Sequence, residues 1–368
     1  MNVKFDLYQS HFLMKMQNHF YCHISPHSIF LHISFFLGLW GIMFLIPNES
    51  FAQACCSGGT PLSGSTLGIQ SMEASNLQIQ LSYDYNTQRS LFQSSKNLDD
   101  NNRDRNTHSF LLRSSYAFNS KFSATGIFSF IQQEERNRFN GFDDTFTRVN
   151  GIGDVVLMLQ YQVISKNNAS LIFSGGIKAP IGSTDRVDPR TGIVYAADLQ
   201  PGTGSWDYIG GVNFTVNNIM KNNLNFLTLF TYRLTNDALR FGGAQRYEFG
   251  DELQLLMGVT DSYVIGKGIF DPSLLIRYRH TGVDQSRLEG GNPDWFDTPN
   301  TSGNWLHLVP GIDWHLNTNI KLGISSEIPI YRNLNGTQLT TTFIFRTSIS
   351  YNLSFAKKDQ INLEGIKF

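Results

Sequence analysis

Two adjacent cysteines, Cys55 and Cys56, are residues whose types could do chemistry. They follow an Ala-Gln-Ala triplet at 52–54, and the third cysteine, Cys22, lies far upstream. Thiolates bind soft metals, but a metal site needs further ligands and none stands near this pair. Cys-x-x-Cys spacing does not occur, which argues against structural zinc, and adjacent cysteines close a disulfide ring poorly. We therefore predict no metal site and no cofactor.

The segment before the cysteines explains them better. Residues 33–46, "ISFFLGLWGIMFLI", are strongly apolar but shorter than the roughly 20 residues of a membrane-spanning helix. The Ala-x-Ala triplet that follows is typical of a signal peptidase site, so we predict that 1–54 is a cleaved signal peptide, with a non-cleaved anchor as the alternative. Cleavage after residue 54 would leave Cys55 first, which makes Cys55 the candidate for lipidation. A lipid anchor needs an aliphatic residue three before the cysteine, where this chain has Ala52.

A hydrolytic site would need a serine beside a histidine that a third polar group orients, or paired acids near a histidine. His280 falls on the apolar side of its segment, and no serine lies two residues from it. The acidic pairs at 99–100 and 143–144 fall in stretches rich in Arg and Asn, which favours solvated loops. We predict no catalytic residues and no enzymatic activity, and a membrane hydrolase is the less favoured alternative.

The composition indicates a β-protein with two unlike faces. Charged residues make up 16% of the 368 residues and aromatic residues 13%, whereas charged residues usually make up about a quarter. The mean hydropathy is slightly negative, which excludes a bundle of membrane helices. The net charge of −1 gives no reason to expect a nucleic acid or a strongly charged partner.

From about residue 75 onward, apolar residues alternate with polar ones. In "NLQIQLSYDYN", Leu77, Ile79 and Leu81 share one parity, and Gln78 and Gln80 share the other. Period two is the pattern of a strand with one apolar and one polar face. We count about twelve such segments of roughly 9–13 residues, the length that crosses a bilayer when the strand is tilted.

Short and long connections alternate between these segments, as turns and surface loops do in an outer-membrane barrel. The long connections include 87–106, 182–205 and 281–303, and the short ones include 118–121 and 317–319. We therefore predict an all-β fold, a transmembrane antiparallel up-and-down β-barrel of about twelve strands with both termini in the periplasm. A soluble sandwich or lipocalin-like barrel is the alternative, but its strands are usually about 5–6 residues long.

Charged residues share the polar parity, and so face the lumen if the apolar parity faces lipid. Inside a barrel they mark either a water-filled route or a network that plugs it. Both alternatives stay open, as does the possibility that loops such as 182–205 fold inward. By the same parity, Tyr247, Phe249 and Leu253 are expected to face lipid. The predicted lumen-lining residues are Arg113, Asp154, Lys178, Arg233, Arg277, Arg279, His307, Asp313, Glu327 and Arg346.

Four stretches resemble a known family when they are taken together and in order. They are "GIGDVVLMLQYQV" (151–163), "GGIKAPIGS" (175–183), "LQPGTGSWDYIGGVNF" (199–214) and "IPIYRNLNGTQL" (328–339). They are similar to the outer-membrane barrel "transporter" family described as "putative MetA-pathway of phenol degradation". The resemblance implies a barrel in the outer membrane of a Gram-negative bacterium that passes small hydrophobic or aromatic compounds. It supplies no catalytic residues.

These observations predict a channel or transporter for small, hydrophobic or aromatic, compounds. A non-transporting structural or assembly barrel of the cell envelope is the alternative. The expected partners are membrane lipids and a small-molecule solute, without nucleic acid, and the barrel is expected to be a monomer. The predicted parts are a signal peptide (1–54), a periplasmic lead-in (55–74), a barrel (75–355) and a C-terminal tail (356–368).

Overall fold

The computed structural model describes residues 74–99, 102–138, 145–166, 168–219, 223–241, 245–266, 268–288 and 294–355. The predicted signal peptide, Cys55, nearly all of the lead-in and the C-terminal tail lie outside the described residues. In the part that is described, no helix is long and apolar enough to cross a membrane.

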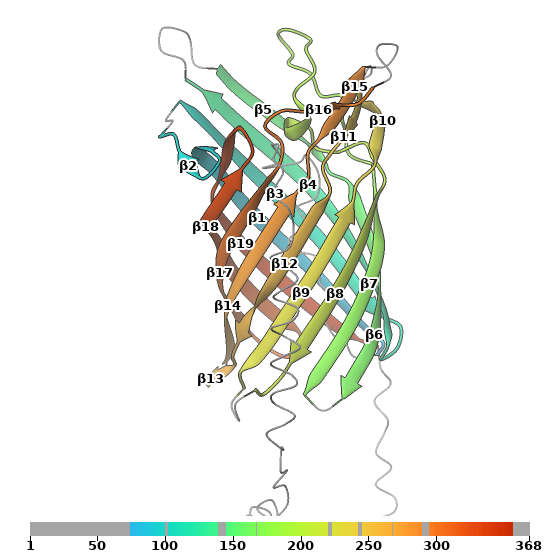
Figure 1. Ribbon diagram of the computed structural model, residues 1–368. Coiled ribbons are helices and arrows are strands. Elements are labelled where there is room, and N and C mark those ends of the chain that lie inside the picture. Colours follow the sequence, from blue (N-terminus) through green and yellow to red (C-terminus); the bar gives the residue numbers. More distant parts are fainter. Residues whose placement is uncertain are drawn as a thin grey trace, which may run out of the picture. The chain divides into compact units, whose positions relative to one another are not determined.

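Within the described residues, twelve antiparallel strands close into a barrel, which confirms the predicted fold class (Figure 1). Strands that follow one another in the chain are neighbours, and the first and last strands also pair, so the sheet has no open edge. The barrel strands are β1 (Asn76–Gln93), β3 (Arg103–Ala117), β4 (Phe122–Asn137), β6 (Val155–Lys166), β7 (Ala169–Ala179), β8 (Asp207–Val216), β9 (Asn225–Leu234), β12 (Glu252–Thr260), β14 (Gly268–Thr281), β17 (Gly303–His315), β18 (Ile320–Leu334) and β19 (Thr337–Ser354).

The alternation in the sequence sets the two faces of the wall. Along β1, Gln78, Ser82 and Asp84 are buried, whereas Ile79 and Leu81 are 37% and 52% exposed on the outside. Exposed apolar side chains of this kind recur on every barrel strand and form the outer band that a lipid-facing barrel requires. The inner face is therefore the face on which the predicted charged residues lie.

We call the end of the barrel at which the long connections lie the mouth. At this end the strands extend further than the apolar pattern predicts. The first and last strands each have 18 residues, more than the predicted length. Beyond the apolar band the ladder of hydrogen bonds continues with polar side chains, so the alternation of apolar residues ends before the strand does. Further strands in the predicted loops are β2 (Lys96–Asn97), β5 (Thr145–Ile152), β10 (Asp237–Phe241), β11 (Gln245–Glu248), β15 (Gln285–Leu288) and β16 (Phe296–Asp297), and β13 (Tyr263–Ile265) lies at the opposite end.

Strands β10, β11, β15 and β16 form a separate sheet at the mouth, which we call the mouth sheet (Figure 1). The expectation that Tyr247 and Phe249 face lipid is wrong, because both are buried in this region. The strand is interrupted between β11 and β12. This interruption moves the rings of Tyr247 and Phe249 away from the outward-facing apolar side chains. They pack instead against Ala238, with Ala197 of a short 3-10 helix (Ala197–Leu199) beside them.

Two adjacent glycines on β7 offer a matched test of the wall's packing. A Cβ on Gly176 would lie 2.2 Å from the carbonyl oxygen of Leu157 on β6, whereas a Cβ on Gly175 would meet no atom within 4 Å. We expect Gly176→Val to lower the free energy of unfolding by about 2 kcal/mol, and Gly175→Val to leave it nearly unchanged. Urea unfolding, followed by the heat-dependent gel mobility of the folded barrel, measures both. Equal stability of the two variants would contradict the close approach of β6 and β7.

Candidate functional site

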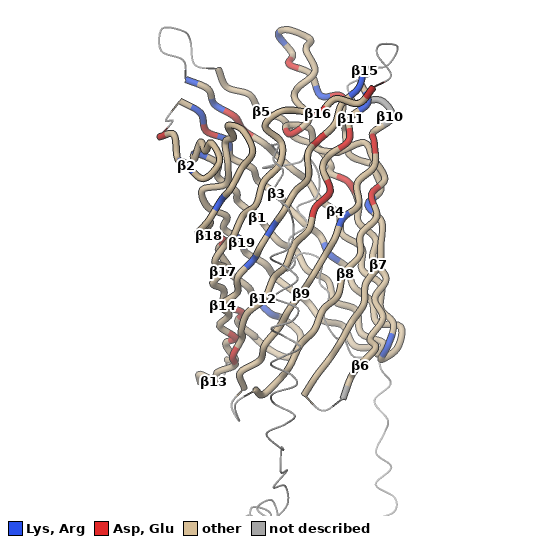
Figure 2. The backbone as a smooth tube through the Cα atoms, in the orientation of Figure 1, with Lys and Arg blue, Asp and Glu red and all other residues tan. Residues whose placement is uncertain are grey.

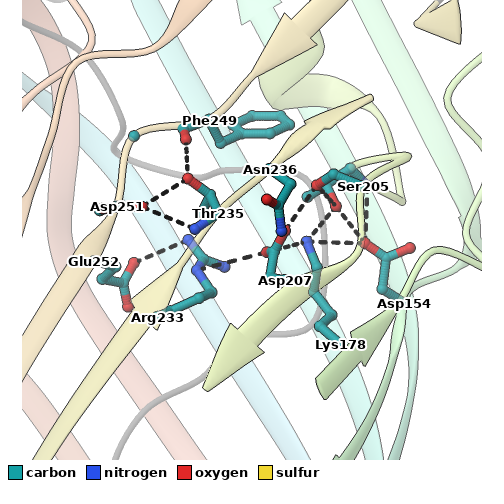
Figure 3. Close-up of polar contacts among 12 residues, drawn as sticks. Asp154, Lys178, Ser205, Asp207, Arg233, Thr235, Asn236, Phe249, Asp251 and Glu252 are labelled. Carbon is teal, nitrogen blue, oxygen red and sulfur yellow. Dashed lines mark hydrogen bonds and ion pairs between the residues drawn. The ribbon is translucent and has the colours of Figure 1, made fainter. Parts of the chain in front are cut away.

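A chain of ion pairs crosses the inner wall from β14 to β7. Arg279 lies 2.7 Å from Oε2 of the Glu252 carboxylate, and Arg233 lies 3.5 Å from the same oxygen. Arg233 also lies 3.9 Å from Asp207, the first residue of β8. Acidic and basic groups therefore alternate from strand to strand (Figure 3).

Lys178 ends this chain between two carboxylates. Its Nζ lies 2.6 Å from Asp207 and 3.4 Å from Asp154, and the three side chains are at most 1% exposed. The ammonium also donates a hydrogen bond to the hydroxyl of Thr203. Charges this deeply buried are stable only as a complete set, because the loss of one partner leaves the others without compensation.

A second chain of ion pairs covers the wall from β1 to β14. Arg346 donates to Asp84 through two nitrogens, at 2.7 and 2.5 Å, and also lies 3.5 Å from Glu327. Glu327 in turn lies 2.5 Å from Arg277. Arg277 and Arg279 are two residues apart on β14 and share its inner face, so the two chains meet there. We call the combined set the ion-pair belt.

The belt follows from strand register. Asp84 is the register partner of Arg346, Lys178 of Asp207, and Glu252 of Arg233. Opposite charges on directly facing residues stabilise a strand pair, and inside a barrel these pairs join around the wall. In the tube of Figure 2, Lys, Arg, Asp and Glu lie mostly in the half of the barrel nearer the mouth.

Asp154 also fixes both ends of the long connection between β7 and β8, residues 180–206, which we call the mouth loop. Its carboxylate accepts hydrogen bonds from the backbone N–H of Gly182 at 3.0 Å and of Thr203 at 2.9 Å. The loop ends approach closely there, since a Cβ on Gly182 would lie 2.6 Å from the Cα of Gly202. Asp154, which stands at one end of the ion-pair belt, thus also holds the two ends of the mouth loop.

The mouth loop folds inward against the barrel wall. Arg105 on β3 donates to the Asp198 carboxylate at 2.6 Å, and Gln133 on β4 donates to the carbonyl of Asp198 at 3.0 Å. Both donors share the inward parity of their strands. Within the loop, the fully buried Gln200 accepts from the N–H of Arg186 and donates to its carbonyl. The loop is therefore a folded constriction on one side of the mouth.

A cavity of about 480 Å³ lies in the lumen. One part of its lining is charged and includes Arg113, Arg277 and Arg346. Another part is apolar and belongs to a cluster of inward-facing side chains that polar parity did not predict. Its members are Leu111, Ile127, Val156, Met158, Ile172, Ile209, Leu229 and Leu256, with Leu275 packed against them. The cavity therefore has an apolar and a charged face.

The ten residues predicted to line the lumen fall into three groups. Seven join the ion-pair belt, namely Asp154, Lys178, Arg233, Arg277, Arg279, Glu327 and Arg346. Arg113 and Asp313 line the cavity, where Arg113 donates to Gln78 at 2.9 Å and Asp313 accepts from Lys321 at 2.7 Å. His307 is 2% exposed and faces Arg277 in the register of β14 and β17.

Asp207 and Gln200 were not among the predicted residues. Asp207 shares the inward parity of Ile209 and Asn213, so the alternation could have identified it. No pattern marks Gln200, because its role depends on the path of a loop. In the described part of the chain, no three His, Cys, Asp or Glu side chains gather as a metal site.

Comparison with known proteins supports this description. The family model "Putative MetA-pathway of phenol degradation" matches residues 102–261, from the start of β3 to just beyond β12. The resemblance to this family is confirmed. No curated protein matches the chain in sequence.

Among solved structures, an outer membrane channel from Pseudomonas putida F1 is similar in fold, with a TM-score of 0.58 and 14% identity over 78% of this chain and 98% of that one. The transport unit of the autotransporter AIDA-I from Escherichia coli has a TM-score of 0.46 and 9% identity, over 81% of this chain and 95% of that one. The TodX monoaromatic hydrocarbon channel has a TM-score of 0.39 and 8% identity, over 77% and 91%. The last two likenesses are too weak to carry an argument, and the first shows the shared fold.

The buried lysine can be tested against an exposed one. Lys178→Met leaves Asp154 and Asp207 without their ammonium, so we expect the free energy of unfolding to fall by about 3–5 kcal/mol. The mouth loop should also become sensitive to trypsin at Arg186 in the folded barrel. Lys121→Met, in an exposed turn, is the control and should change neither property. A Lys178→Met barrel with normal stability and a protected loop would contradict the role of the belt.

Asp284 links the mouth sheet to the segment between β11 and β12. Its carboxylate accepts hydrogen bonds from the Tyr247 hydroxyl at 2.7 Å and from the N–H of Gly250 at 2.8 Å. Burial raises the pKa of Asp284 to about 7, although these two hydrogen bonds act in the opposite direction. The folded mouth therefore keeps a proton that an unfolded segment loses near pH 4.

This raised pKa predicts a pH dependence of the mouth sheet. The contribution of Asp284 to its stability should be fully present below about pH 4 and should decline as the pH rises to about 7, because only the open form gains from ionisation of this group there. The opening free energy of Tyr247, from hydrogen exchange corrected for the intrinsic rate, measures this decline. Asp284→Asn should remove it, and a slope that persists in this variant would assign the titration to another group.

Proposed function

We propose that the chain is a channel in the outer membrane of a Gram-negative bacterium and passes small solutes through its lumen. The observation that carries this proposal is the cavity with one apolar and one charged face inside a barrel of twelve strands. A barrel of this size is wider than those of about eight strands, whose interior side chains fill. The shared fold of the outer membrane channel from Pseudomonas putida F1 supports the placement.

The two faces favour a solute with an apolar body and one anionic group, such as an aromatic acid. Leu229, Leu256 and Leu275 offer apolar contact to a ring, which is released from water when it binds. Arg113 and Arg346 line the other side and can donate hydrogen bonds to a carboxylate. The family description, which names phenol degradation, is consistent with a solute of this class.

The mouth loop sets the width of the entrance in this proposal. It lies against the inner wall through Asp198, and its ends are fixed at Asp154. Movement of the loop tip needs the contacts of Arg105 and Gln133 with Asp198 and the packing of Ala197 on the mouth sheet to break, whereas the ends stay fixed. The tip is therefore the part that would respond to a solute.

A non-transporting barrel is the second candidate. The ion-pair belt favours it, because buried and paired charges stiffen a wall and narrow the lumen. In both readings the barrel is proposed to lie among membrane lipids as a monomer, to bind no nucleic acid and to have no enzymatic activity.

Conductance separates the two candidates. Purified barrels in planar bilayers should give discrete steps, and replacement of residues 187–199 by a short Gly-Ser linker should raise the conductance several-fold, since it removes the constriction. Substitution of the exposed 317–319 turn by the same residues is the control and should leave conductance unchanged. Silence of both the wild type and the shortened variant would support the non-transporting barrel.

The solute class can be measured by liposome swelling. Benzoate should enter faster than a neutral sugar of similar size, and Leu256→Ser should reduce this preference without closing the pore, because it makes the apolar face polar. The outward-facing Leu255→Ser is the control. Equal entry of benzoate and sugar through the wild type would refute the amphipathic selectivity while leaving the channel itself intact.

A further inference from the structure

A basic hollow lies on the outer surface of the barrel, on the opposite side of the wall from the proposed pore. It has a volume of about 320 Å³ and is lined at the mouth end by residues of β1, β3, β4 and β5 and by Arg138, which follows β4. Arginines outnumber acids in its lining, which consists of Arg89, Arg103, Asp104, Asn106, Glu134, Arg136, Arg138 and Phe146. We call it the arginine hollow.

Parity places the hollow on the outside. Arg136 shares its side of β4 with Phe130, and Asp104 shares its side of β3 with Phe110. Phe110 and Phe130 are 47% and 42% exposed, and they belong to the outer apolar band. The hollow is therefore reached from the membrane side and not from the lumen.

Strand register aligns the outer side chains of β3, β4 and β5 in rows, and the rows change from apolar to charged toward the mouth. The first row is apolar and joins Phe110, Phe130 and Ile152. The next row, roughly 7 Å further along the strands, contains His108, which accepts or donates a hydrogen bond with Tyr83 at 2.8 Å. Aromatic groups that carry a polar atom are typical of the girdle at a membrane interface.

The charged rows follow directly beyond this girdle. Glu134 faces Arg148 at 2.8 Å, and Asp104 pairs with Arg138 at 2.7 Å. The guanidiniums of Arg136 and Arg148 lie over the ring of Phe146, at 5.8 and 5.7 Å from its centre. These contacts hold planar donors in place beyond the girdle, on the side on which the lipid headgroups of a membrane lie.

We propose that the arginine hollow binds the phosphorylated headgroup of an outer-leaflet lipid whose acyl chains lie along the apolar rows beneath it. Guanidinium groups bind phosphate through paired hydrogen bonds, and the excess of arginine over acid suits an anion. The apolar rows that lie below the girdle favour a lipid over a soluble anion, because only a lipid contacts both these rows and the hollow. This inference rests on the proposed channel in the outer membrane and on the predicted periplasmic position of both termini, which puts the mouth at the outer leaflet, and it does not depend on transport.

Native mass spectrometry of the detergent-purified barrel tests this proposal with three probes. They are a bis-phosphorylated acylated disaccharide, the same lipid without its phosphates, and inorganic phosphate. The phosphorylated lipid should bind saturably, and Arg89→Gln with Arg136→Gln should weaken it about 30-fold, as the loss of two cationic contacts implies. Lys121→Gln with Arg190→Gln removes the same charge elsewhere and should leave binding unchanged.

Each other outcome overturns the proposal. Equal binding of the dephosphorylated lipid would show an apolar surface without headgroup recognition, and equally tight binding of inorganic phosphate would show a site for a free anion. Unchanged binding in the arginine variant, or no binding at all, would also refute it. Heat-dependent gel mobility confirms that the variant is folded, and Arg89→Gln alone, at an exposed position, is the milder second variant.

Conductance of the same variants separates this proposal from the channel. Arg89 and Arg136 lie outside the lumen, so conductance should stay normal whether or not the lipid binds. Failure of conductance together with arginine-dependent lipid binding would refute only the channel, and the reverse result would refute only the lipid site.

Discussion

The ammonium of Lys178, buried between Asp154 and Asp207, is the interaction on which the arrangement of the lumen depends. An isolated charge could not remain in this environment, because its loss of hydration costs more than any single contact returns. The structure meets the requirement with two carboxylates from different parts of the chain. Asp207 belongs to the wall, while Asp154 holds the backbone of Gly182 and Thr203 at the ends of the mouth loop. Wall and loop therefore depend on the same charge.

Much of this fold could be predicted because residues that alternate along a barrel strand face alternately outward and inward. Once Ile79 and Leu81 face outward, Gln78 and every residue of its parity must face inward, and the same logic placed Lys178 and Arg233 on the inner face. Register could not be predicted in detail, since it depends on turns and bulges such as the shift in β1 between Thr87 and Ser90. The pairing of particular residues within the ion-pair belt could therefore not be predicted from the sequence.

The remaining failures have a common physical cause. Parity holds only while a strand continues, and the break between β11 and β12 turned Tyr247 and Phe249 from expected lipid contacts into the core of the mouth sheet. The apolar side of the lumen was missed for a related reason. Inward residues such as Ile127 and Val156 interrupt the polar parity one at a time, and only strand pairing brings them together as neighbours.

The two faces of the wall use arginine in different ways. Inside, the described arginines of the belt alternate with carboxylates, as Arg346 does between Asp84 and Glu327, so the lumen gains fixed dipoles with little net charge. Outside, arginines exceed acids around the hollow, and Arg136 lies over an aromatic ring where the belt would place a carboxylate. In the functions proposed above, a balanced interior would let a weakly charged solute pass without being held, whereas an unbalanced exterior would retain an anion. One alternating strand can supply both, because adjacent residues belong to opposite faces.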